Sequence, residues 1–517
     1  MLFNSYLFLL LFLPIALAGH YLASAISLRL AAFWLCLTSF VFYGWWNPQF
    51  VALLALSIAF NYVVSRLILR FAGHARLQGL VTALGVGADL AALFHYKYFA
   101  TLFNFLGEWG LTQGGMHELI LPLGISFFTF TQIGYLLDCR SGIVKERSLL
   151  SYVLFVTFFP HLIAGPILHH KEMMPQFAQR RTFRLSASNV AIGSTIFFIG
   201  LAKKVLIADN IGAYAAPLFN EPAAPSLLLA WGGVLAYAFQ LYFDFSGYSD
   251  MAIGLSRLFG VRLPLNFDSP YKARNIAQFW RRWHMTLSRF LRDYLYIPLG
   301  GNRCGPLRRH VNLMLTMVLG GLWHGAGWNF IVWGALHGAY LGIHKGWGAA
   351  ARRLHLPSGT RAGKLAATLL TFTAVCVAWV FFRAPDMPVA LTILKGMAGG
   401  FGLALPDALA AYLLPLQPML AALGVVFYLG GGTAFVETWT SIALAALIAF
   451  GLPNTQQIMR RFEPALDFHG AAAAKRHGVA RWLTWRATPA WAGAIALLAL
   501  ASLLALNRPA QFLYFQF

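Results

Sequence analysis

Charged residues are scarce in this chain, and acidic residues are scarcer than basic ones. Of 517 residues, 11% are charged, 59% are hydrophobic, and the mean hydropathy is +0.64. Because so few charges cannot cover the surface of a water-soluble protein of this length, a soluble globular fold is excluded. The sequence predicts an all-α polytopic membrane protein.

Cysteine is also rare, and several familiar binding motifs are missing. The four cysteines are widely spaced and form neither a C-x-x-C pair nor a zinc spacing, so no disulfide framework and no metal centre are expected. The sequence has no P-loop, no G-x-G-x-x-G that opens a helix, and no HExxH. An ATP-driven pump is therefore not a leading hypothesis. No tightly bound cofactor and no nucleic-acid partner are expected.

Long apolar runs make up most of the chain. Runs that can cross a hydrocarbon core, which takes about 20 residues, lie near 3–22, 27–45, 49–70, 78–104, 150–168, 189–208, 225–243, 311–343, 365–382, 408–450 and 489–506. The longest runs have room for more than one span. We therefore expect one domain, residues 1–517, with roughly 11–13 membrane helices or half-helices.

Proline and glycine interrupt two apolar segments, Leu121–Phe130 and Phe158–Ile167. Irregular backbone at membrane depth needs protein or water beside it, so these segments are candidate walls of a chamber. The alternative is that they are kinked structural helices.

The net charge of +22 is unevenly distributed. Eleven basic residues lie between Arg257 and Arg309, against Asp268 and Asp293. The positive-inside rule places this block, and a second basic loop at 453–488, on the cytoplasmic side. Such a surface attracts anionic lipid headgroups, and it attracts the phosphates of a nucleotide-bearing donor equally.

Residues 274–296 have the periodicity of a basic amphipathic helix. At about 100° per residue, one sector holds Arg281, Arg282, Arg289 and Arg292. The opposite side holds Trp283, Leu287, Phe290, Leu291 and Tyr294. This pattern predicts a helix that lies flat at the bilayer surface. His284, at the edge of the apolar sector, either faces a buried entrance or is an incidental residue of a surface anchor.

A second histidine, His324, lies in the apolar sequence GGLWHG, residues 320–325. An ionisable residue in an apolar span is costly and marks a candidate functional site. The glycines around it are predicted to leave room for a narrow ligand, and a neutral imidazole suits general-base action on a hydroxyl group. If the run is one helix, His337 and His344 project away from His324 and lie outside its site.

Polar residues also occur within the apolar segment 240–254, namely Asp244, Ser246, Tyr248 and Asp250. One of the carboxylates could orient a histidine or line a polar acceptor path. Alternatively, these residues cap a helix break at the membrane edge.

The motifs QLYFDFSGYSDMAIGL, FWRRWHMTLSRFLRDYLYIPLGGNR, LGGLWHG and the terminal FLYFQF resemble those of the membrane-bound O-acyltransferase superfamily. They are similar in particular to its bacterial branch, which includes alginate and cellulose acetylation proteins and teichoic-acid D-alanylation proteins. The likeness covers nearly the whole chain and is densest over 240–347, the expected catalytic core. The resemblance implies a multi-helix fold around a central tunnel, with interfacial amphipathic helices.

The resemblance further implies that His324 is catalytic and that His284 is its companion. We expect His324 to act as the base and His284 to polarise the carbonyl of an acyl thioester, with acetyl-coenzyme A as the expected donor. Trp280, Arg281, Arg282 and Trp323, with the polar residues at 244–250, are the candidate donor-binding or tunnel-lining residues.

The expected location is the bacterial inner membrane, surrounded by lipid. A periplasmic SGNH-type acetyltransferase partner would complete the transfer to an exopolysaccharide of the alginate or cellulose type. Two alternatives stay open: a D-alanyl or other acyltransferase fed by a carrier protein, and an exporter that moves a polymer or lipid without chemistry.

Overall fold

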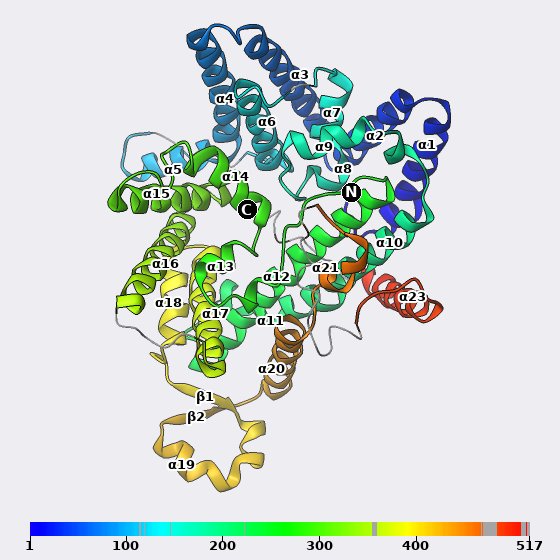
Figure 1. The fold of residues 1–517 in the computed structure, drawn as a ribbon. Helices are drawn as coiled ribbons and strands as arrows, with labels where there is room; N and C mark the ends of the chain where they lie inside the picture. The colour runs from blue at the N-terminus through cyan, green and yellow to red at the C-terminus, as the bar shows by residue number, and fades with distance from the viewer. Residues whose placement is uncertain are drawn as a thin grey trace.

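The computed structural model consists almost entirely of helices (Figure 1). It describes the chain except residues 113–114, 118, 145, 222, 354–358, 467, 469–482, 508–512 and 514–517. Within the described residues the strands are β1 (Leu403–Pro406) and β2 (Val425–Tyr428), which pair in parallel. The predicted all-α fold class is confirmed.

The α-helices described in the first half of the chain run from the N-terminus to the long helix α12. They are α1 (Leu13–Ile26), α2 (Leu28–Gly44), α3 (Gln49–Arg70), α4 (Ala75–Lys97), α5 (Phe99–Glu108), α6 (Ile125–Arg140), α7 (Leu149–Thr157), α8 (Phe159–Leu162), α9 (His170–Phe177), α10 (Ala187–Ala202), α11 (Asp209–Asn220) and α12 (Leu227–Leu258). A π-helical segment, Lys203–Ala208, joins α10 to α11.

The second half contributes further helices, which range from short turns to long spans. They are α13 (Ile276–Trp280), α14 (Met285–Leu291), α15 (Pro306–His324), α16 (Trp328–Arg353), α17 (Arg361–Arg383), α18 (Met387–Met397), α19 (Gln417–Ala422), α20 (Gly432–Ala446), α21 (Thr455–Ile458) and α23 (Pro489–Leu504). A π-helical segment, Arg292–Tyr296, continues α14. The strands and α19 form a lobe that projects from the helices (Figure 1).

Seven helical segments among the described residues are long and apolar enough to cross a membrane. They are Phe8–Ile26, Gln49–Arg70, Ala75–Lys97, Ala187–Asn220, Leu227–Leu258, Arg361–Arg383 and Gly432–Gly451, and four shorter apolar helices accompany them. The chain is a multi-pass membrane protein. The described residues contain fewer full-length spans than the number of apolar runs in the sequence, because some runs are divided between elements. The run at 311–343 is divided after His324 between α15 and α16, and the first part of the run at 408–450 belongs to the projecting lobe.

The long helix α12 runs through the centre of the molecule (Figure 1) and is buried over most of its length. It packs tightly against α10 through pairs of glycines. A Cβ at Gly200 would lie 2.6 Å from the carbonyl oxygen of Gly247, and a Cβ at Gly193 would lie 2.7 Å from that of Gly254. Small residues at such contacts let two helix backbones approach closely, as is common between membrane helices.

The polar residues of α12 lie within one continuous helix, so the alternative that they cap a helix break is wrong. Ion pairs explain why the helix tolerates its carboxylates. Asp244 Oδ1 lies 2.8 Å from Lys204 Nζ, and Asp250 Oδ2 lies 2.6 Å from Lys203 Nζ. Thr455 donates a hydrogen bond to Asp250 Oδ2 at 2.6 Å. These carboxylates hold α12 to its neighbours.

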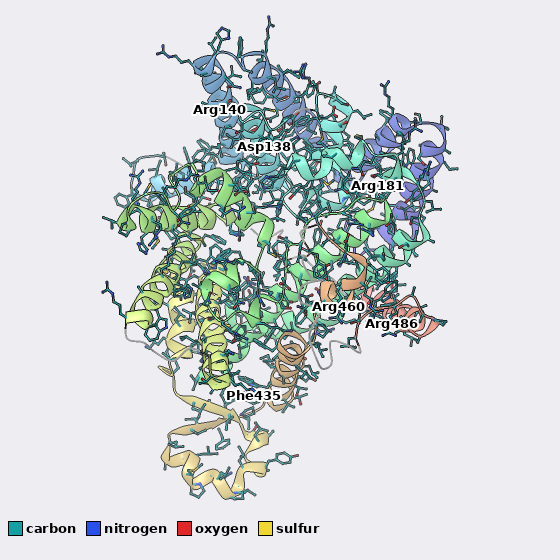
Figure 2. The ribbon with its side chains drawn as sticks, in the orientation of Figure 1. Asp138, Arg140, Arg181, Phe435, Arg460 and Arg486 are labelled. Carbon is teal, nitrogen blue, oxygen red and sulfur yellow. The ribbon has the colours of Figure 1, made fainter. Side chains whose placement is uncertain are left out.

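Part of the basic loop 453–488 lies outside the described residues. Arg460 and Arg486, on either side of the undescribed stretch, lie on the same side of the molecule near α21 and α23 (Figure 2). The terminal FLYFQF motif also lies outside the described residues except for Leu513. The backbone N–H of Leu513 donates to Asp244 Oδ2 at 3.0 Å.

Candidate active site

A cavity among the described residues lies at the C-terminal end of α15. This cavity, the histidine cavity, has a volume of about 90 Å³ and is lined by Trp46, Lys97, residues 121–127, Ile163, Trp323 and His324. Both proline- and glycine-interrupted segments of the sequence therefore contribute to its wall. The prediction that these segments line a chamber is confirmed for residues 121–127 and Ile163.

The second cavity, the arginine cavity, has a volume of about 450 Å³. Its polar lining comes mainly from the segment after α13, and the residues are Trp280, Arg281, Ser288, Arg289, Arg292 and Tyr296. Apolar residues of α14, α15 and α16 also belong to the lining. A cavity that combines cationic, hydroxyl and apolar groups suits a ligand that carries phosphates and a hydrocarbon arm.

One face of α15 borders both cavities. Thr316 and Met317 line the arginine cavity, whereas Trp323 and His324 line the histidine cavity. From Met317 to Trp323 the helix rises only about 9 Å. Gly320 lies between them, where a Cβ would stand 3.1 Å from Leu291 Cδ1. The two cavities are thus separated by less than two turns of a single helix.

His324 is the last residue of α15 and is 6% exposed. Aromatic rings surround its imidazole. The ring centroids of Trp323, Phe382 and Trp333 lie 4.8, 5.1 and 5.2 Å away, all close to edge-on. An imidazole held in an aromatic cage beside a cavity has its orientation fixed and retains access to a small ligand.

His284 lies where the predicted amphipathic helix is broken. Instead of one helix over 274–296, the structure has α13, a turn, and then α14, with His284 at φ +43° and ψ 53° just before α14. The interpretation of a helix lying flat on lipid is wrong, because Trp283, Leu287 and Phe290 are buried within the protein. The segment does have the periodicity of an amphipathic helix, but its apolar side packs against protein and not against lipid.

Asn266 fixes the orientation of the His284 imidazole. The side-chain oxygen of Asn266 accepts a hydrogen bond from Thr286 Oγ1 at 3.0 Å, and His284 Nδ1 lies 3.2 Å from that oxygen. Because an amide oxygen only accepts, Nδ1 carries the proton and Nε2 carries the lone pair. His284 lies outside the candidate membrane spans. Burial of the imidazole lowers its pKa to about 3, so the ring is neutral.

Trp323 contacts both imidazoles. Its ring centroid lies 4.8 Å from that of His324 and 6.4 Å from that of His284. The two histidines therefore share one aromatic neighbour, but their settings differ. His324 lines the histidine cavity, whereas His284 is 1% exposed and lines neither cavity.

The glycines around His324 serve a different purpose from the one predicted. A Cβ at Gly321 would collide with the carbonyl oxygen of Phe330, and one at Gly325 would collide with the Phe330 ring. These glycines let the start of α16 pack against the end of α15. The space that they leave is filled by protein, so the prediction of room for a ligand is wrong for both positions.

His337 is also nearer to His324 than predicted. Because the chain turns back after His324, the two histidines are on separate helices, and the projection along a single helix was wrong. The Trp333 ring lies 5.2 Å from His324 and 4.9 Å from His337. His337 is fully buried and stacks on Phe279. It belongs to the aromatic packing behind the site.

The candidate donor-binding residues divide into two groups. Trp280 and Arg281 line the arginine cavity, Trp323 lines the histidine cavity, and Arg282 lines neither. The polar residues of α12, Asp244, Ser246, Tyr248 and Asp250, also line neither cavity. Asp244 and Asp250 are occupied by their lysine partners, and Tyr248 stacks on Phe3.

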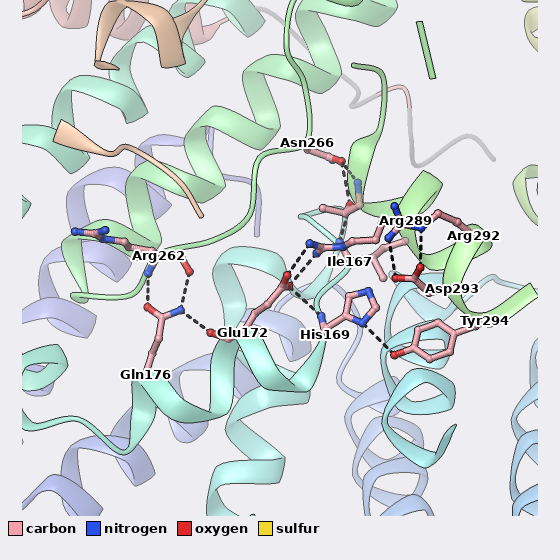
Figure 3. Close-up of polar contacts among 11 residues, drawn as sticks. Ile167, His169, Glu172, Gln176, Arg262, Asn266, Arg289, Arg292, Asp293 and Tyr294 are labelled. Atoms are coloured by element: carbon pink, nitrogen blue, oxygen red, sulfur yellow. Dashed lines mark hydrogen bonds and ion pairs between the residues drawn. The ribbon is translucent and has the colours of Figure 1, made fainter. Parts of the chain in front are cut away.

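Two of the arginines of this cavity are neutralised by carboxylates (Figure 3). Arg289 makes a two-point contact with Glu172, with Nη1 to Oε1 at 2.6 Å and Nη2 to Oε2 at 2.9 Å. Arg292 pairs with Asp293 at 2.7 Å. Arg281 is exposed, and no described carboxylate forms an ion pair with it. Arg281 is therefore the lining arginine whose charge is available to a ligand.

Sequence analysis missed Lys97 and the Glu172–Arg289 pair. Lys97 lines the histidine cavity from the end of α4. A lysine among aromatic residues at the end of an apolar run, HYKYF at 95–99, was a usable signal, because a charge at such a position is costly. The Glu172–Arg289 contact had no local signal, because the two residues are far apart in sequence.

Comparison with known proteins agrees with this architecture. The sequence profile of the MBOAT, membrane-bound O-acyltransferase family matches residues 91–382. The chain is 45% identical to a peptidoglycan O-acetyltransferase of Helicobacter pylori over 435 residues, which cover 78% of this chain and 81% of the relative. It is 37% identical over the full length of both chains to a probable alginate O-acetylase AlgI of Azotobacter vinelandii.

A teichoic acid D-alanyltransferase of Streptococcus thermophilus is more distant, at 32% identity over 46% of this chain and 60% of the relative. The chain belongs to the membrane-bound O-acyltransferase family and is an O-acyltransferase.

Proposed function

We propose that this protein transfers an acetyl group from acetyl-coenzyme A on the cytoplasmic side to a hydroxyl acceptor beside His324, for O-acetylation of a cell-surface polysaccharide. The position of His324 is the observation that carries the proposal. Its imidazole borders the histidine cavity, on the same helix face that borders the arginine cavity. A donor held by its phosphates in one cavity can thus reach an imidazole in the other.

The two cavities support the identity of the donor. The arginine cavity offers Arg281 to a phosphate group and an apolar wall to a pantetheine arm. The histidine cavity, at about 90 Å³, has room for several water molecules. The cavity therefore has room for a small acyl group beside His324.

The proposed reaction uses His324 as a general base. The imidazole takes the proton of the acceptor hydroxyl, and the oxygen attacks the thioester carbonyl carbon. The carbon–sulfur bond breaks, and the thiolate of coenzyme A leaves with the proton from the imidazolium. In the tautomer set by Asn266, His284 Nε2 can accept a hydrogen bond but cannot donate one. Because His284 also lines neither cavity, we assign it the orientation of Trp323 in place of the polarisation of the thioester carbonyl.

The acceptor is proposed by analogy with the relatives, which are named for alginate and for peptidoglycan. A polysaccharide of the alginate or cellulose type is the proposed final acceptor, and the bacterial inner membrane is the proposed location. Because acetyl-coenzyme A stays in the cytoplasm, we propose that a periplasmic SGNH-type acetyltransferase receives the acetyl group and completes the transfer.

The test compares His324→Ala with His344→Ala. His344 is a half-buried histidine of α16 that lines neither cavity, so it is a matched control. Both variants and the wild-type protein are expressed in cells that lack the native gene, and membrane protein levels and polysaccharide O-acetyl content are measured. We expect His324→Ala to abolish acetylation at normal protein level and His344→Ala to leave it unchanged.

Purified protein in lipid nanodiscs gives a direct readout. With acetyl-labelled acetyl-coenzyme A, the wild type should release free thiol and His324→Ala should not. Wild-type acetylation by His324→Ala would contradict the catalytic role. Turnover of a D-alanyl carrier protein without turnover of acetyl-coenzyme A would favour the D-alanyl alternative, and polymer export without any thioester cleavage would favour an exporter.

A further inference from the structure

The backbone carbonyl groups at the C-terminal end of α15 accept hydrogen bonds from side chains at the junction of α4 and α5. The last carbonyl groups of an α-helix have no partner within the helix, and Gly325 continues the chain in an extended conformation, at φ −164° and ψ 162°. Lys97 Nζ donates hydrogen bonds to the carbonyl oxygens of Trp323 at 2.6 Å and His324 at 2.7 Å. The hydroxyl of Tyr98 donates to the carbonyl of Leu322 at 2.7 Å.

These two consecutive residues, at the junction of α4 and α5, form a cap on a helix that lies more than 200 residues away in the chain. A cation at the C-terminal end of a helix also interacts favourably with the partial negative charge there. Within the described residues no carboxylate forms an ion pair with Lys97. The polar contacts of Lys97 Nζ are therefore with the carbonyl oxygens at the end of α15.

Lys97 belongs to the active site as well as to the cap. Its side chain lines the histidine cavity next to His324, and its ammonium group lies 6.0 Å from the Trp323 ring centroid. Lys97 Nζ thus donates hydrogen bonds to the backbone of Trp323 and His324, the two residues of α15 that line the cavity. Helix ends fray when their carbonyl groups lack partners, and a shift of His324 would move the imidazole relative to its ligand.

We propose that Lys97 is a positioning residue of the acyl-transfer site: its ammonium group clamps the C-terminal end of α15 and so holds the His324 imidazole at the cavity wall. The inference rests on the proposed function of His324. A misplacement of about 1 Å at a reacting group can cost on the order of a hundredfold in rate. Loss of the clamp should therefore lower kcat and leave donor binding in the arginine cavity intact.

The experiment measures kcat and KM for acetyl-coenzyme A with the full-length protein in nanodiscs, together with the melting temperature of each variant. Lys97→Met keeps the approximate length of the side chain and removes both hydrogen bonds to the end of α15. Lys97→Arg keeps charge and donors and serves as the conservative rescue. Tyr98→Phe removes one neighbouring capping bond without removing charge. Lys97→Gln replaces Lys97→Met if that variant fails to accumulate, because the amide nitrogen of Gln lies one bond nearer to the backbone than Lys Nζ and cannot reach both carbonyl groups.

We expect Lys97→Met to lower kcat at least about tenfold with KM changed less than about twofold, and Lys97→Arg to recover a large part of the rate. Tyr98→Phe should have a smaller effect. A purely structural role would lower the melting temperature and the amount of folded protein but leave kcat per folded molecule unchanged.

Two results would overturn the inference. One is a wild-type kcat in Lys97→Met, or in Lys97→Gln if the first variant does not accumulate. The other is a Lys97→Arg variant that folds and is as slow as the neutral variant. His324→Ala is assayed in parallel: if it keeps its activity, the proposed function fails, whereas an inactive His324→Ala with a fully active Lys97→Met contradicts the role of Lys97 alone.

Discussion

Charge reversal at two adjacent arginines tests whether the arginine cavity binds the donor. Arg281 lines that cavity and has no carboxylate in an ion pair with it among the described residues, whereas Arg282 lines neither cavity. The variants Arg281→Glu and Arg282→Glu change the net charge by the same amount. Any effect that comes from general attraction to lipid or to a polyanion should therefore be similar in both.

The expected magnitude follows from the contact that Arg281 is proposed to make. A hydrogen bond between a guanidinium and a phosphate is worth about 1.5–3 kcal/mol. Because Arg281 is exposed at the cavity wall, the lower part of this range applies, and each 1.4 kcal/mol corresponds to about tenfold in affinity. We expect Arg281→Glu to raise KM for acetyl-coenzyme A at least about tenfold and Arg282→Glu to raise it less than about threefold.

The assay is steady-state release of free thiol by nanodisc-reconstituted protein over a range of acetyl-coenzyme A concentrations. Repeating it in 0.15 M and in about 1 M salt is informative, because the Debye length falls from about 8 to about 3 Å. High salt should remove the small effect at Arg282 and retain most of the effect at Arg281. Equal changes in KM for the two variants, or none in Arg281→Glu, would refute donor binding in this cavity.

Two further predictions concern stability, measured by unfolding in detergent micelles. Lys204→Met leaves the buried Asp244 without its cation and should cost about 3–5 kcal/mol, whereas the double variant Lys204→Met with Asp244→Leu should recover much of that loss. Lys204 also pairs with Asp209 at 2.5 Å, so no recovery in the double variant would show that the contact with Asp244 alone is not the cause. Gly247→Ala places a Cβ 2.7 Å from the carbonyl oxygen of Gly200 and should destabilise the protein by about 1–3 kcal/mol. A neutral result would mean that the two helices can separate without penalty.

The fold class followed from composition, because apolar runs of this length leave few alternatives to membrane helices. The location of His324 beside a cavity also followed from sequence, since an ionisable residue in an apolar run requires a compensating environment. Residues 121–127 were correctly expected to line a chamber because proline and glycine leave backbone that needs a neighbour.

What sequence could not provide were the contacts between distant segments. The pattern over 274–296 fits a helix whether its apolar side meets lipid or protein, so periodicity did not reveal the turn at His284. The turn after His324 changed the positions of all later residues, including His337. Lys97 and Glu172 act through partners that lie more than 100 residues away in the chain, and no local pattern records such pairs.

The left-handed backbone conformation at His284 is a source of local strain. A left-handed conformation costs an ordinary L-residue about 1–2 kcal/mol, and glycine adopts it without that penalty. Replacement of His284 by glycine would relieve that strain, but it would also remove a buried ring that packs against Phe245 and is held by Asn266, which costs about 2–5 kcal/mol. The loss of packing outweighs the relief of strain, so variants selected only for heat tolerance should keep the imidazole beside Trp323.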